Sequence, residues 1–378
     1  MMEVLTIFGT RPEAIKLAPV IAELRARDGE IRSHVCVTAQ HRSMLDQVLE
    51  WFGITPDFDL GLMEPGQGLC DFAGRAFPAL SRVLDRIDAD MVLVQGDTTT
   101  ALVAALAAFY RGVPVGHVEA GLRTRDLRNP FPEELNRRVV GVAARYHFAP
   151  TVRAAQALLE EQTPADRIFV TGNTVIDALK MTLARPVPME HCWDEDGKRI
   201  LLVTAHRRES FGGPLEAVCR ALRRLAERHP DIQIIYPVHL NPNVREPVNR
   251  ILSGHPRIQL IEPLRYEQFV HLMARAYLIL TDSGGIQEEA PFLRKPTLVM
   301  RETTERPEAL EAGTAVLVGT SEAQIIAGCE GLLAEGPAYQ RMARGGSPFG
   351  DGKAAARIVD VLLGQGAKTE FFHTERQS

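Results

Sequence analysis

Acidic side chains stand directly after short apolar runs that have the composition of β-strands. Asp97 follows Met91–Val94, and Glu119 follows Pro114–Val118. A carboxylate in such a place is costly unless it is paired or used, and carboxylates can transfer protons to and from a substrate. Asp97 could instead cap the helix expected from Thr99, whereas capping does not explain Glu119. We therefore favour a functional role for Glu119 and keep both interpretations of Asp97 open.

Basic side chains occupy the same kind of position. Arg11 and Lys16 flank the turn after Val4–Phe8, and His206-Arg207-Arg208 follows Ile200–Thr204. The first pair suits a diphosphate or the charge of a leaving group, although Arg11 could simply cap a neighbouring carboxyl end. The second cluster suits an anionic ligand, and His206 is placed to titrate.

Three weaker candidates complete the charged positions. His239 in PVHLNPN is similar to His206 but a weaker candidate, and a packed histidine with a satisfied ring is the alternative interpretation. Glu133 and Glu134 open a helix after Pro130-Phe131-Pro132. Acidic residues in a first helical turn are expected from the helix dipole alone, so their position does not by itself predict function.

The stretch TDSGGIQEEAP, Thr281–Pro291, joins a strand-like run to a helix. Asp282-Ser283 can cap that helix, and Gly284-Gly285 let a ligand approach the backbone. Free N–H groups at a helix start suit a phosphate, and Glu289, one turn further on, can accept from sugar hydroxyls. Arg306 adds a cation beyond this turn. The same residues could instead form an ordinary capped turn between a strand and a helix that binds no ligand.

These residues need a scaffold that brings their turns together. Strand-like and helix-like segments alternate along the chain, which predicts an α/β fold of parallel sheets with crossover helices. The expected strands are Val4–Phe8, Val35–Thr38, Met91–Val94, Pro114–Val118, Tyr146–Ala149, Ile200–Thr204, Ile232–Tyr236, Ile258–Ile261, Tyr277–Leu280, Thr297–Met300 and Ala315–Val318. The Pro- and charge-rich stretch Arg185–Lys198 is interpreted as an interdomain connection. Two doubly wound sheets facing a cleft would place the chemistry at the carboxyl ends of their strands.

Composition and missing motifs exclude several classes of protein. A length of 378 residues predicts two domains, and a net charge of −5 argues against a nucleic-acid or membrane binder. The 5 scattered cysteines fit buried thiols in a reducing cytoplasm, and the 11 histidines show no paired metal-ligand spacing. No GxGxxG follows the first strand, and neither GxxxxGK[ST] nor GxSxG occurs. Spacing alone thus predicts an enzyme with a cleft for a phosphorylated sugar or nucleotide.

A set of motifs in fixed order makes the prediction specific. They are GTRPEAIKLAP (Gly9–Pro19), TAQHRSMLDQV (Thr38–Val48), QGDTTT (Gln95–Thr100), GHVEAGLRT (Gly116–Thr124), PFPEELNR (Pro130–Arg137), GNTVIDAL (Gly172–Leu179), TAHRRESFG (Thr204–Gly212), PVHLNPNVREPV (Pro237–Val248), DSGGIQEEAP (Asp282–Pro291) and TTERPEA (Thr303–Ala309). Over almost the whole chain, this order resembles the non-hydrolysing UDP-N-acetylglucosamine 2-epimerases.

The resemblance implies the GT-B type of fold, with two Rossmann-like doubly wound domains. Residues 1–172 would carry the catalytic carboxylates and residues 173–350 would bind UDP. A helix within residues 351–378 would cross back to the first domain, ahead of a mobile tail. It also implies a cytoplasmic homodimeric isomerase that interconverts UDP-GlcNAc and UDP-ManNAc for cell-surface polysaccharide. The UDP-sugar would be its partner, and no cofactor or metal is expected.

The resemblance also implies residue roles. Asp97, Glu119 and Glu133 match the acidic positions that transfer protons, with the division into acid and base left open. The diphosphate would be stabilised by Arg11, Lys16, His206 and the amides of Ser283-Gly284-Gly285. His206 also counts as catalytic, and Asp97 and Glu119 also count as substrate-binding. Glu289 would bind the ribose, and Arg306 and Phe269 complete the substrate-binding set.

A second, regulatory UDP-GlcNAc site occurs in some members of the family, where the Gln-His-Arg run is followed by Gln. Here Gln40-His41-Arg42 is followed by Ser43. This departure argues against allosteric activation, although Gln40, Arg207 and His239 remain as candidates for such a site.

Several activities stay open beside the reversible epimerase. They are a 2-epimerase of a modified UDP-HexNAc sugar, a hydrolysing epimerase that releases ManNAc and UDP, and a GT-B glycosyltransferase, which would need an acceptor. A non-catalytic nucleotide-sugar sensor is disfavoured, because all three carboxylates are present.

Overall fold

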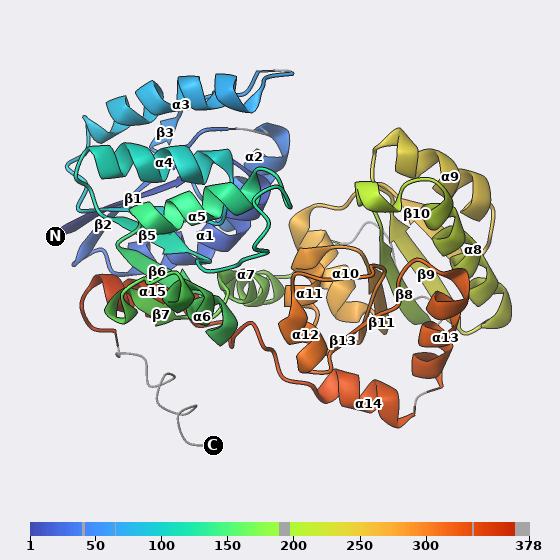
Figure 1. The fold of residues 1–378 in the computed structure, drawn as a ribbon. Helices are drawn as coiled ribbons and strands as arrows, with labels where there is room; N and C mark the ends of the chain where they lie inside the picture. The colour runs from blue at the N-terminus through green and yellow to red at the C-terminus, as the bar shows by residue number, and fades with distance from the viewer. Residues whose placement is uncertain (40–41, 65, 189–196, 335, 367–378) are drawn as a thin grey trace. The chain divides into compact units, whose positions relative to one another are not determined.

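The chain forms two compact units (Figure 1), Met1–Met181 with Phe349–Ser378, and Thr182–Pro348. This computed structural model describes residues 1–39, 42–64, 66–188, 197–334 and 336–366. The first unit extends beyond the expected boundary at residue 172, and the chain returns to it after the second unit.

A seven-stranded sheet forms the centre of the first unit, with the order β3-β2-β1-β4-β5-β6-β7 and parallel pairing throughout. Its strands are β1 (Met2–Phe8), β2 (Ile31–Val37), β3 (Phe58–Asp59), β4 (Met91–Gln95), β5 (Val115–Val118), β6 (Tyr146–Ala149) and β7 (Ile168–Val170). All residues of β4 are buried, as expected for a parallel sheet that is covered on both faces.

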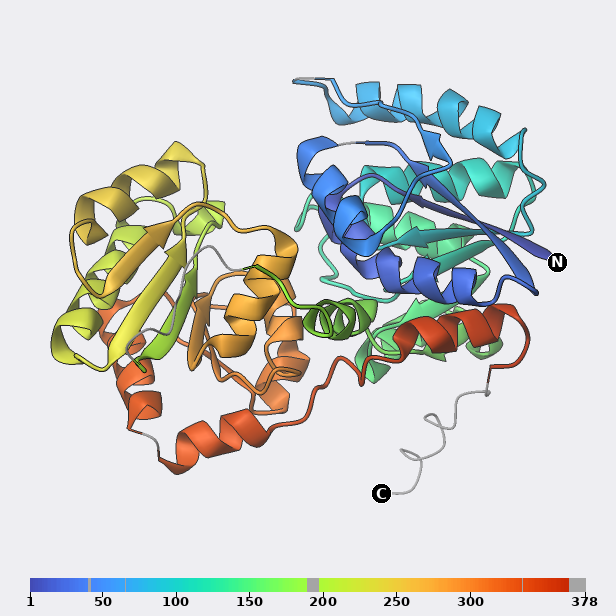
Figure 2. The same ribbon diagram turned by 180° about the vertical axis from the view of Figure 1, so that it is seen from behind.

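Helices cover both faces of this sheet (Figure 2). On one face α3 (Leu69–Leu84), α4 (Thr99–Tyr110) and α5 (Glu133–Ala143) pack side by side. On the other, α1 (Arg11–Ala26) packs against α2 (Arg42–Phe52) and against α15 (Ala354–Leu362), drawn in red. Right-handed crossovers to either side of β1 and β4 produce this division. The remaining helices are α6 (Val152–Glu160), the short 3-10 turn η1 (Ala165–Arg167) and α7 (Thr174–Leu183).

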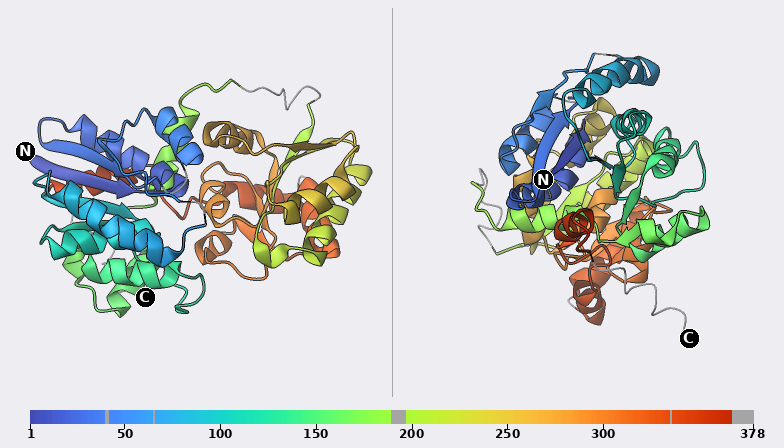
Figure 3. Two further views of the ribbon diagram at one scale, coloured as in Figure 1. Left: turned by 90° about the horizontal axis from the view of Figure 1, so that it is seen from above. Right: turned by 90° about the vertical axis from the view of Figure 1, so that its left-hand side faces the viewer.

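The returning segment is held by specific contacts to the first unit, and Figure 3 shows it from two further sides. Asp177 accepts hydrogen bonds from the N–H groups of Ala354 (3.2 Å) and Ala355 (2.9 Å) at the start of α15. Arg27, the residue after α1, pairs with Asp360 of α15 at 3.0 Å. The Asp177 carboxylate therefore satisfies backbone donors that α15 cannot satisfy internally.

The second unit repeats the design with a six-stranded parallel sheet of order β10-β9-β8-β11-β12-β13. Its strands are β8 (Arg199–Thr204), β9 (Ile232–Pro237), β10 (Ile258–Ile261), β11 (Leu278–Thr281), β12 (Thr297–Val299) and β13 (Ala315–Leu317). Its helices are η2 (Arg208–Ser210), α8 (Gly213–Arg228), α9 (Pro242–Leu252), α10 (Tyr266–Arg275), α11 (Gly284–Glu289), α12 (Pro307–Glu311), α13 (Glu322–Leu333) and α14 (Pro337–Arg344).

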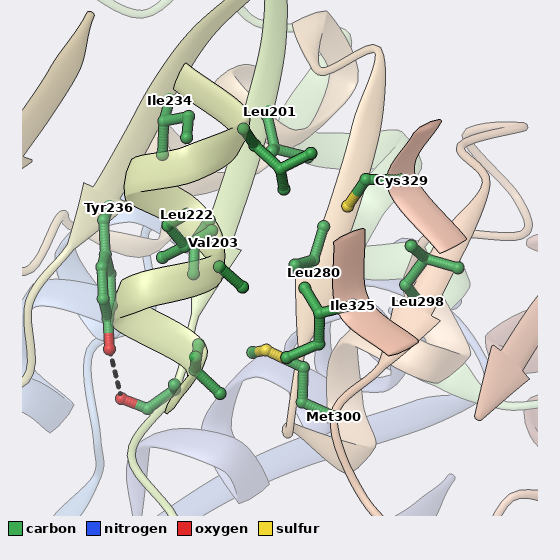
Figure 4. Packing of buried hydrophobic residues seen from close by; sticks show 14 of the residues in the cluster. Leu201, Val203, Leu222, Ile234, Tyr236, Leu280, Leu298, Met300, Ile325 and Cys329 are labelled. Atoms are coloured by element: carbon green, nitrogen blue, oxygen red, sulfur yellow. Dashed lines mark hydrogen bonds between the residues drawn. The ribbon is translucent and has the colours of Figure 1, made fainter. Parts of the chain in front are cut away.

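Apolar residues of this sheet and of α8 and α13 form one core (Figure 4). It contains Leu201, Val203, Leu222, Ile234, Leu280, Leu298, Met300, Ile325 and Cys329. The ring of Tyr236 is buried among them, and its hydroxyl donates to the carbonyl of Ala205 at 3.0 Å. That bond satisfies the polar end of an otherwise apolar side chain and ties β9 to the loop after β8.

The predicted alternation of strands and helices is confirmed, and Tyr146–Ala149 and Ile258–Ile261 have the predicted bounds. The expectation that the cysteines are buried is wrong for Cys70, which is exposed at the start of α3, and Cys192 lies outside the described residues. The predicted mobile tail also falls outside them. No helix in the described ranges is long and apolar enough to cross a membrane.

Candidate active site

Each sheet has one place where the direction of its strand order reverses, between β1 and β4 in the first unit and between β8 and β11 in the second. Ligands of doubly wound sheets bind outside the carboxyl ends of the strands at this switch point, because the loops diverge there. The turns after β1 and β4 carry Arg11 and Asp97, and those after β8 and β11 carry His206 and Ser283. The fold thus places predicted site residues at both switch points.

The turn after β1 is organised by Glu13, which was not among the residues predicted from the sequence. Its carboxylate accepts from the N–H groups of Gly9 (3.1 Å) and Thr10 (2.8 Å) and from the Thr98 hydroxyl (2.7 Å). Burial raises the pKa of Glu13 to about 7, although these hydrogen bonds oppose the rise. One side chain therefore joins the turns after β1 and β4, which hold Arg11 and Asp97. The spacing of Thr10 and Glu13, that of a capping box, was the available signal.

Lys16 and Glu119 are brought into contact. Lys16 Nζ, on α1, donates to Glu119 Oε2 after β5, and Gln95 Nε2 donates to the same oxygen at 3.0 Å. The Glu119 side chain is only 8% exposed, and its backbone has a φ of 64°. Because glutamate rarely adopts this left-handed conformation, the position is strained, and such strain is concentrated at functional sites.

Asp97 does not cap α4, so that interpretation is wrong. Thr98 is the N-cap, and its hydroxyl accepts from Ala101 N at 3.0 Å. The Asp97 carboxylate instead pairs with Arg137 of α5, and its backbone carbonyl accepts from Asn136 Nδ2 at 2.9 Å. The Asp97 side chain is 27% exposed, so part of its carboxylate faces solvent. Arg137 was missed, although its spacing from Glu133 places both on one side of a helix.

The two glutamates that open α5 have different surroundings. Glu134 is fully buried, and it accepts from the N–H groups of Thr124 (3.0 Å) and Arg125 (3.2 Å). Glu133 is half-buried, and its carboxylate makes no hydrogen bond or ion pair with the residues that the structure describes. Glu134 therefore has a structural role, which leaves Glu133 as the accessible carboxylate of this helix.

In the second unit, Asp282 organises the switch point. It does not cap α11, whose N-cap is Ser283, so the expectation that Asp282 shares in the cap is wrong. Its carboxylate accepts from the N–H groups of His206 (2.7 Å) and Arg207 (2.8 Å) and lies 3.2 Å from His206 Nδ1. Burial acts to raise the pKa of Asp282, but the His206 ring and these donors outweigh burial and hold that pKa below its ordinary value. The anion fixes the ring of His206, which is 42% exposed.

His239 and Arg207 lie beside this histidine. The rings of His206 and His239 stack with centroids 5.7 Å apart, and His239 Nδ1 accepts from Asn241 N at 3.1 Å. Partial burial and the charge of His206 lower the pKa of His239. Arg207 approaches Gly284, at 3.8 Å from where a Cβ of that glycine would lie. Of the suggested regulatory residues, Arg207 and His239 are therefore close to His206, whereas Gln40 lies outside the described residues.

Polar contacts join α11 to the segment that follows β12. Gln287 donates to the Ser283 carbonyl at 3.1 Å and accepts from Thr304 at 2.6 Å. Arg306 pairs with the buried Glu288, and Glu289 is also buried. A Cβ on Gly284 or Gly285 would meet no atom closer than 3.8 Å, so the space above this backbone is open. Phe269 is half-buried on α10.

The described part of the chain offers no evident place for a metal. Among those residues, no group of three or more His, Cys, Asp or Glu side chains could hold a metal ion.

Known proteins resemble this chain over almost its whole length. The family model described as UDP-N-acetylglucosamine 2-epimerase matches residues 22–363. The chain belongs to this family. A Yersinia pestis protein named UDP-N-acetylglucosamine 2-epimerase is 56% identical over 370 residues, which span 96% of this chain and 98% of that protein. The prediction of a UDP-GlcNAc 2-epimerase is therefore confirmed at the level of the family.

Solved structures agree with the family assignment. The UDP-GlcNAc 2-epimerase from Neisseria meningitidis, crystallised with UDP-GlcNAc, is 48% identical, with 96% of this chain and 100% of that chain covered and a TM-score of 0.88. A kitacinnamycin glycosyltransferase shares the fold alone, at 12% identity and a TM-score of 0.66, with 97% and 99% of the two chains covered. The predicted fold class, two Rossmann-like doubly wound domains of the GT-B type, is thus confirmed for this 2-epimerase family member.

Proposed function

We propose that this protein catalyses the reversible, non-hydrolysing interconversion of UDP-GlcNAc and UDP-ManNAc. The observation that carries the proposal is the pair of carboxylates at the strand ends of the first unit, each held by its own cation. Lys16 holds Glu119, and Arg137 holds Asp97. Two fixed carboxylates suit a reaction that removes a proton from one face of a carbon and returns it to the other.

The chemistry needs neither an oxidant nor water. A base removes the C2 proton, the C1–O bond to UDP breaks with both electrons leaving on the diphosphate, and a C1=C2 double bond forms to give 2-acetamidoglucal. An acid then delivers a proton to the opposite face of C2, and a diphosphate oxygen re-forms the bond to C1. Atoms and charge balance across the two halves, so only proton donors, proton acceptors and stabilised negative charge are required.

We assign these tasks to the groups already described. Asp97, Glu119 and Glu133 transfer the protons, and Arg11, Lys16 and His206 stabilise the diphosphate. Preorganisation supports this assignment, because the Asp282 carboxylate fixes His206 and its neighbouring backbone. The remaining substrate contacts are assigned to Ser283, Gly284, Gly285, Glu289, Arg306 and Phe269.

The wider setting follows from the same proposal. The product UDP-ManNAc would supply ManNAc units to cell-surface polysaccharide, and the enzyme would act in the cytoplasm as a homodimer. Ser43 stands where the family pattern has glutamine, which argues against activation through a second UDP-GlcNAc site, although Arg207 and His239 remain as candidates for such a site. Hyperbolic kinetics in UDP-GlcNAc would show that this departure removes the activation.

Product analysis tests the proposal. ³¹P and ¹H NMR of the purified protein with UDP-GlcNAc should show UDP-ManNAc growing to a constant ratio, with no continued release of UDP. Continued accumulation of UDP and free ManNAc would identify a hydrolysing epimerase. Turnover that depends on an added acceptor would identify a glycosyltransferase, and a preference for a modified UDP-HexNAc would redefine the substrate.

A further inference from the structure

Helix α5 fixes Asp97 through two consecutive residues. Asn136 Nδ2 donates to the Asp97 carbonyl at 2.9 Å, and the Arg137 guanidinium donates to the Asp97 carboxylate. Both donors are buried, whereas Asp97 keeps part of its side chain exposed. The backbone and the carboxylate of Asp97 are therefore both tied to one helix, while part of the Asp97 side chain stays exposed.

Arg137 is itself held from behind. Glu134 Oε2 lies 3.4 Å from Arg137 Nη1, and Glu134 is fully buried. Both Glu134 oxygens also accept backbone N–H groups, from Thr124 and Arg125. A buried ion pair contributes little net stability, because desolvation offsets the attraction of the charges. The arrangement is thus better explained by the orientation that it gives to Asp97 than by its contribution to stability.

The same helix carries Glu133. Arg137 follows Glu133 by four positions, so the two side chains lie on one side of α5. The helix that orients Asp97 therefore also carries Glu133, another of the carboxylates to which proton transfer is assigned.

We propose that Arg137 is a positioning residue: held by Glu134 and acting together with Asn136, it fixes the Asp97 carboxylate in the orientation needed for proton transfer at C2. The inference rests on the proposed function, and it assigns Arg137 a task that is carried out through Asp97 and not by contact with the substrate. Loss of alignment between a reacting atom and its catalytic group is expected to lower turnover by about 100-fold while substrate affinity is preserved.

Arg137→Met, Arg137→Lys and Arg138→Met test this proposal in the full-length protein. Arg138 is the matched control, because it is the next residue of α5 and pairs at 3.4 Å with Glu161 away from Asp97. We expect Arg137→Met to lower kcat for UDP-GlcNAc by about 100-fold, with KM and the calorimetric Kd for UDP within about 3-fold of wild type. Arg137→Lys should recover about 10-fold of that loss, and Arg138→Met should keep kcat within about 2-fold.

A kcat of Arg137→Met within about 3-fold of wild type would overturn the proposal, as would an effect confined to KM or to UDP affinity. If Arg137→Met does not fold, Asn136→Ala replaces it, since this change removes only the donor to the Asp97 carbonyl. A fall in kcat of about 10-fold at unchanged UDP affinity supports the proposal, and an unchanged kcat contradicts it.

A wild-type protein without epimerase activity would overturn the proposed function and this inference together, whereas an active wild type with an active Arg137→Met overturns the inference alone.

Discussion

Glu119 combines three properties that support its proposed role in proton transfer. Its backbone is in the left-handed region, its side chain is almost fully buried, and its carboxylate is held by Lys16 and Gln95. Left-handed strain at a non-glycine residue costs on the order of 1–3 kcal/mol, and the surrounding contacts must maintain it. A glycine here would be less strained, which supports the proposed role of the Glu119 side chain in proton transfer.

Substituting the carboxylates separates this explanation from a structural one. We expect Asp97→Asn, Glu119→Gln and Glu133→Gln each to lower turnover of UDP-GlcNAc by at least about 100-fold, because each change removes a proton-transfer group. Initial rates measured by NMR provide the test, with Glu160→Gln, at an exposed ion pair with Arg125, as the control. A near-normal rate for any one variant would remove that residue from the catalytic set.

Glu13 predicts a pH dependence of stability. Burial raises its pKa in the folded state from 4.5 to about 7, so the folded protein holds the proton to a higher pH than the unfolded chain does. The free energy of unfolding therefore falls as pH rises from about 4.5 to about 7, by on the order of 3 kcal/mol from this group. Glu13→Gln carries no ionisable group and should lack this decline.

Denaturant unfolding of wild type and Glu13→Gln between pH 5 and pH 8 measures the effect. The difference in unfolding free energy should move in favour of the variant as pH rises. The exposed Asp88→Asn serves as the control, and a wild-type-to-variant difference that is constant with pH would contradict the explanation.

The residues proposed to carry the reaction were visible in the sequence, but the partners that orient them were not. The strand-end positions of Asp97 and Glu119 are local features, and a local pattern predicts them. The pairing of Asp97 with Arg137 joins residues far apart in sequence and depends on how α4 and α5 pack. The same limit explains why the sequence suggests a cap at Asp282: its actual partners follow β8, a strand paired with β11.

At the scale of elements, the turn between β1 and α1 is restricted by its neighbours. A Cβ on Gly9 would lie 2.2 Å from Thr38 Oγ1 and 2.5 Å from Thr100 Oγ1, two hydroxyls that bond to one another at 2.9 Å. The backbone of this turn thus runs directly over the ends of β2 and α4. Only glycine lets the turn that carries Arg11 lie so close to them.

Gly9→Ala should therefore lower the free energy of unfolding by about 1–3 kcal/mol, because the added methyl group must displace the hydroxyl pair. Gly74→Ala is the matched control. Gly74 is exposed within α3, and no atom lies within 4 Å of where its methyl group would stand, so alanine should add about 0.5–1 kcal/mol. Denaturant unfolding at one pH measures both, and a Gly9→Ala variant as stable as wild type would show that the turn can move aside.

Elements differ in how well the sequence predicts them. The alanine-rich run Thr99–Tyr110 predicts a helix with these bounds, and α4 has them, because alanine favours a helix and the run extends over several turns. The strands β3, of two residues, and β7, of three, were not predicted, since so short a run carries no periodicity. Helix α14 was missed as well. None of these three elements carries a candidate site residue.

At the scale of the whole molecule, the two units share one structural arrangement. Each unit has a parallel sheet whose strand order reverses at one place, and in each unit a buried carboxylate joins the loops at that place. Glu13 does so in the first unit and Asp282 in the second. Sequence alternation predicts two such sheets, but only the three-dimensional pairing identifies the carboxylate that holds each set of loops.

The most direct test of this account is the exchange of hydrogen at C2. The protein is incubated with UDP-GlcNAc in deuterated water, and the nucleotide sugars are analysed by NMR and mass spectrometry. Elimination and re-addition through a glucal predict UDP-ManNAc that carries one deuterium at C2, together with gradual labelling of the returned UDP-GlcNAc. UDP-ManNAc without deuterium at C2, or the absence of both UDP-ManNAc and labelling, would contradict the account.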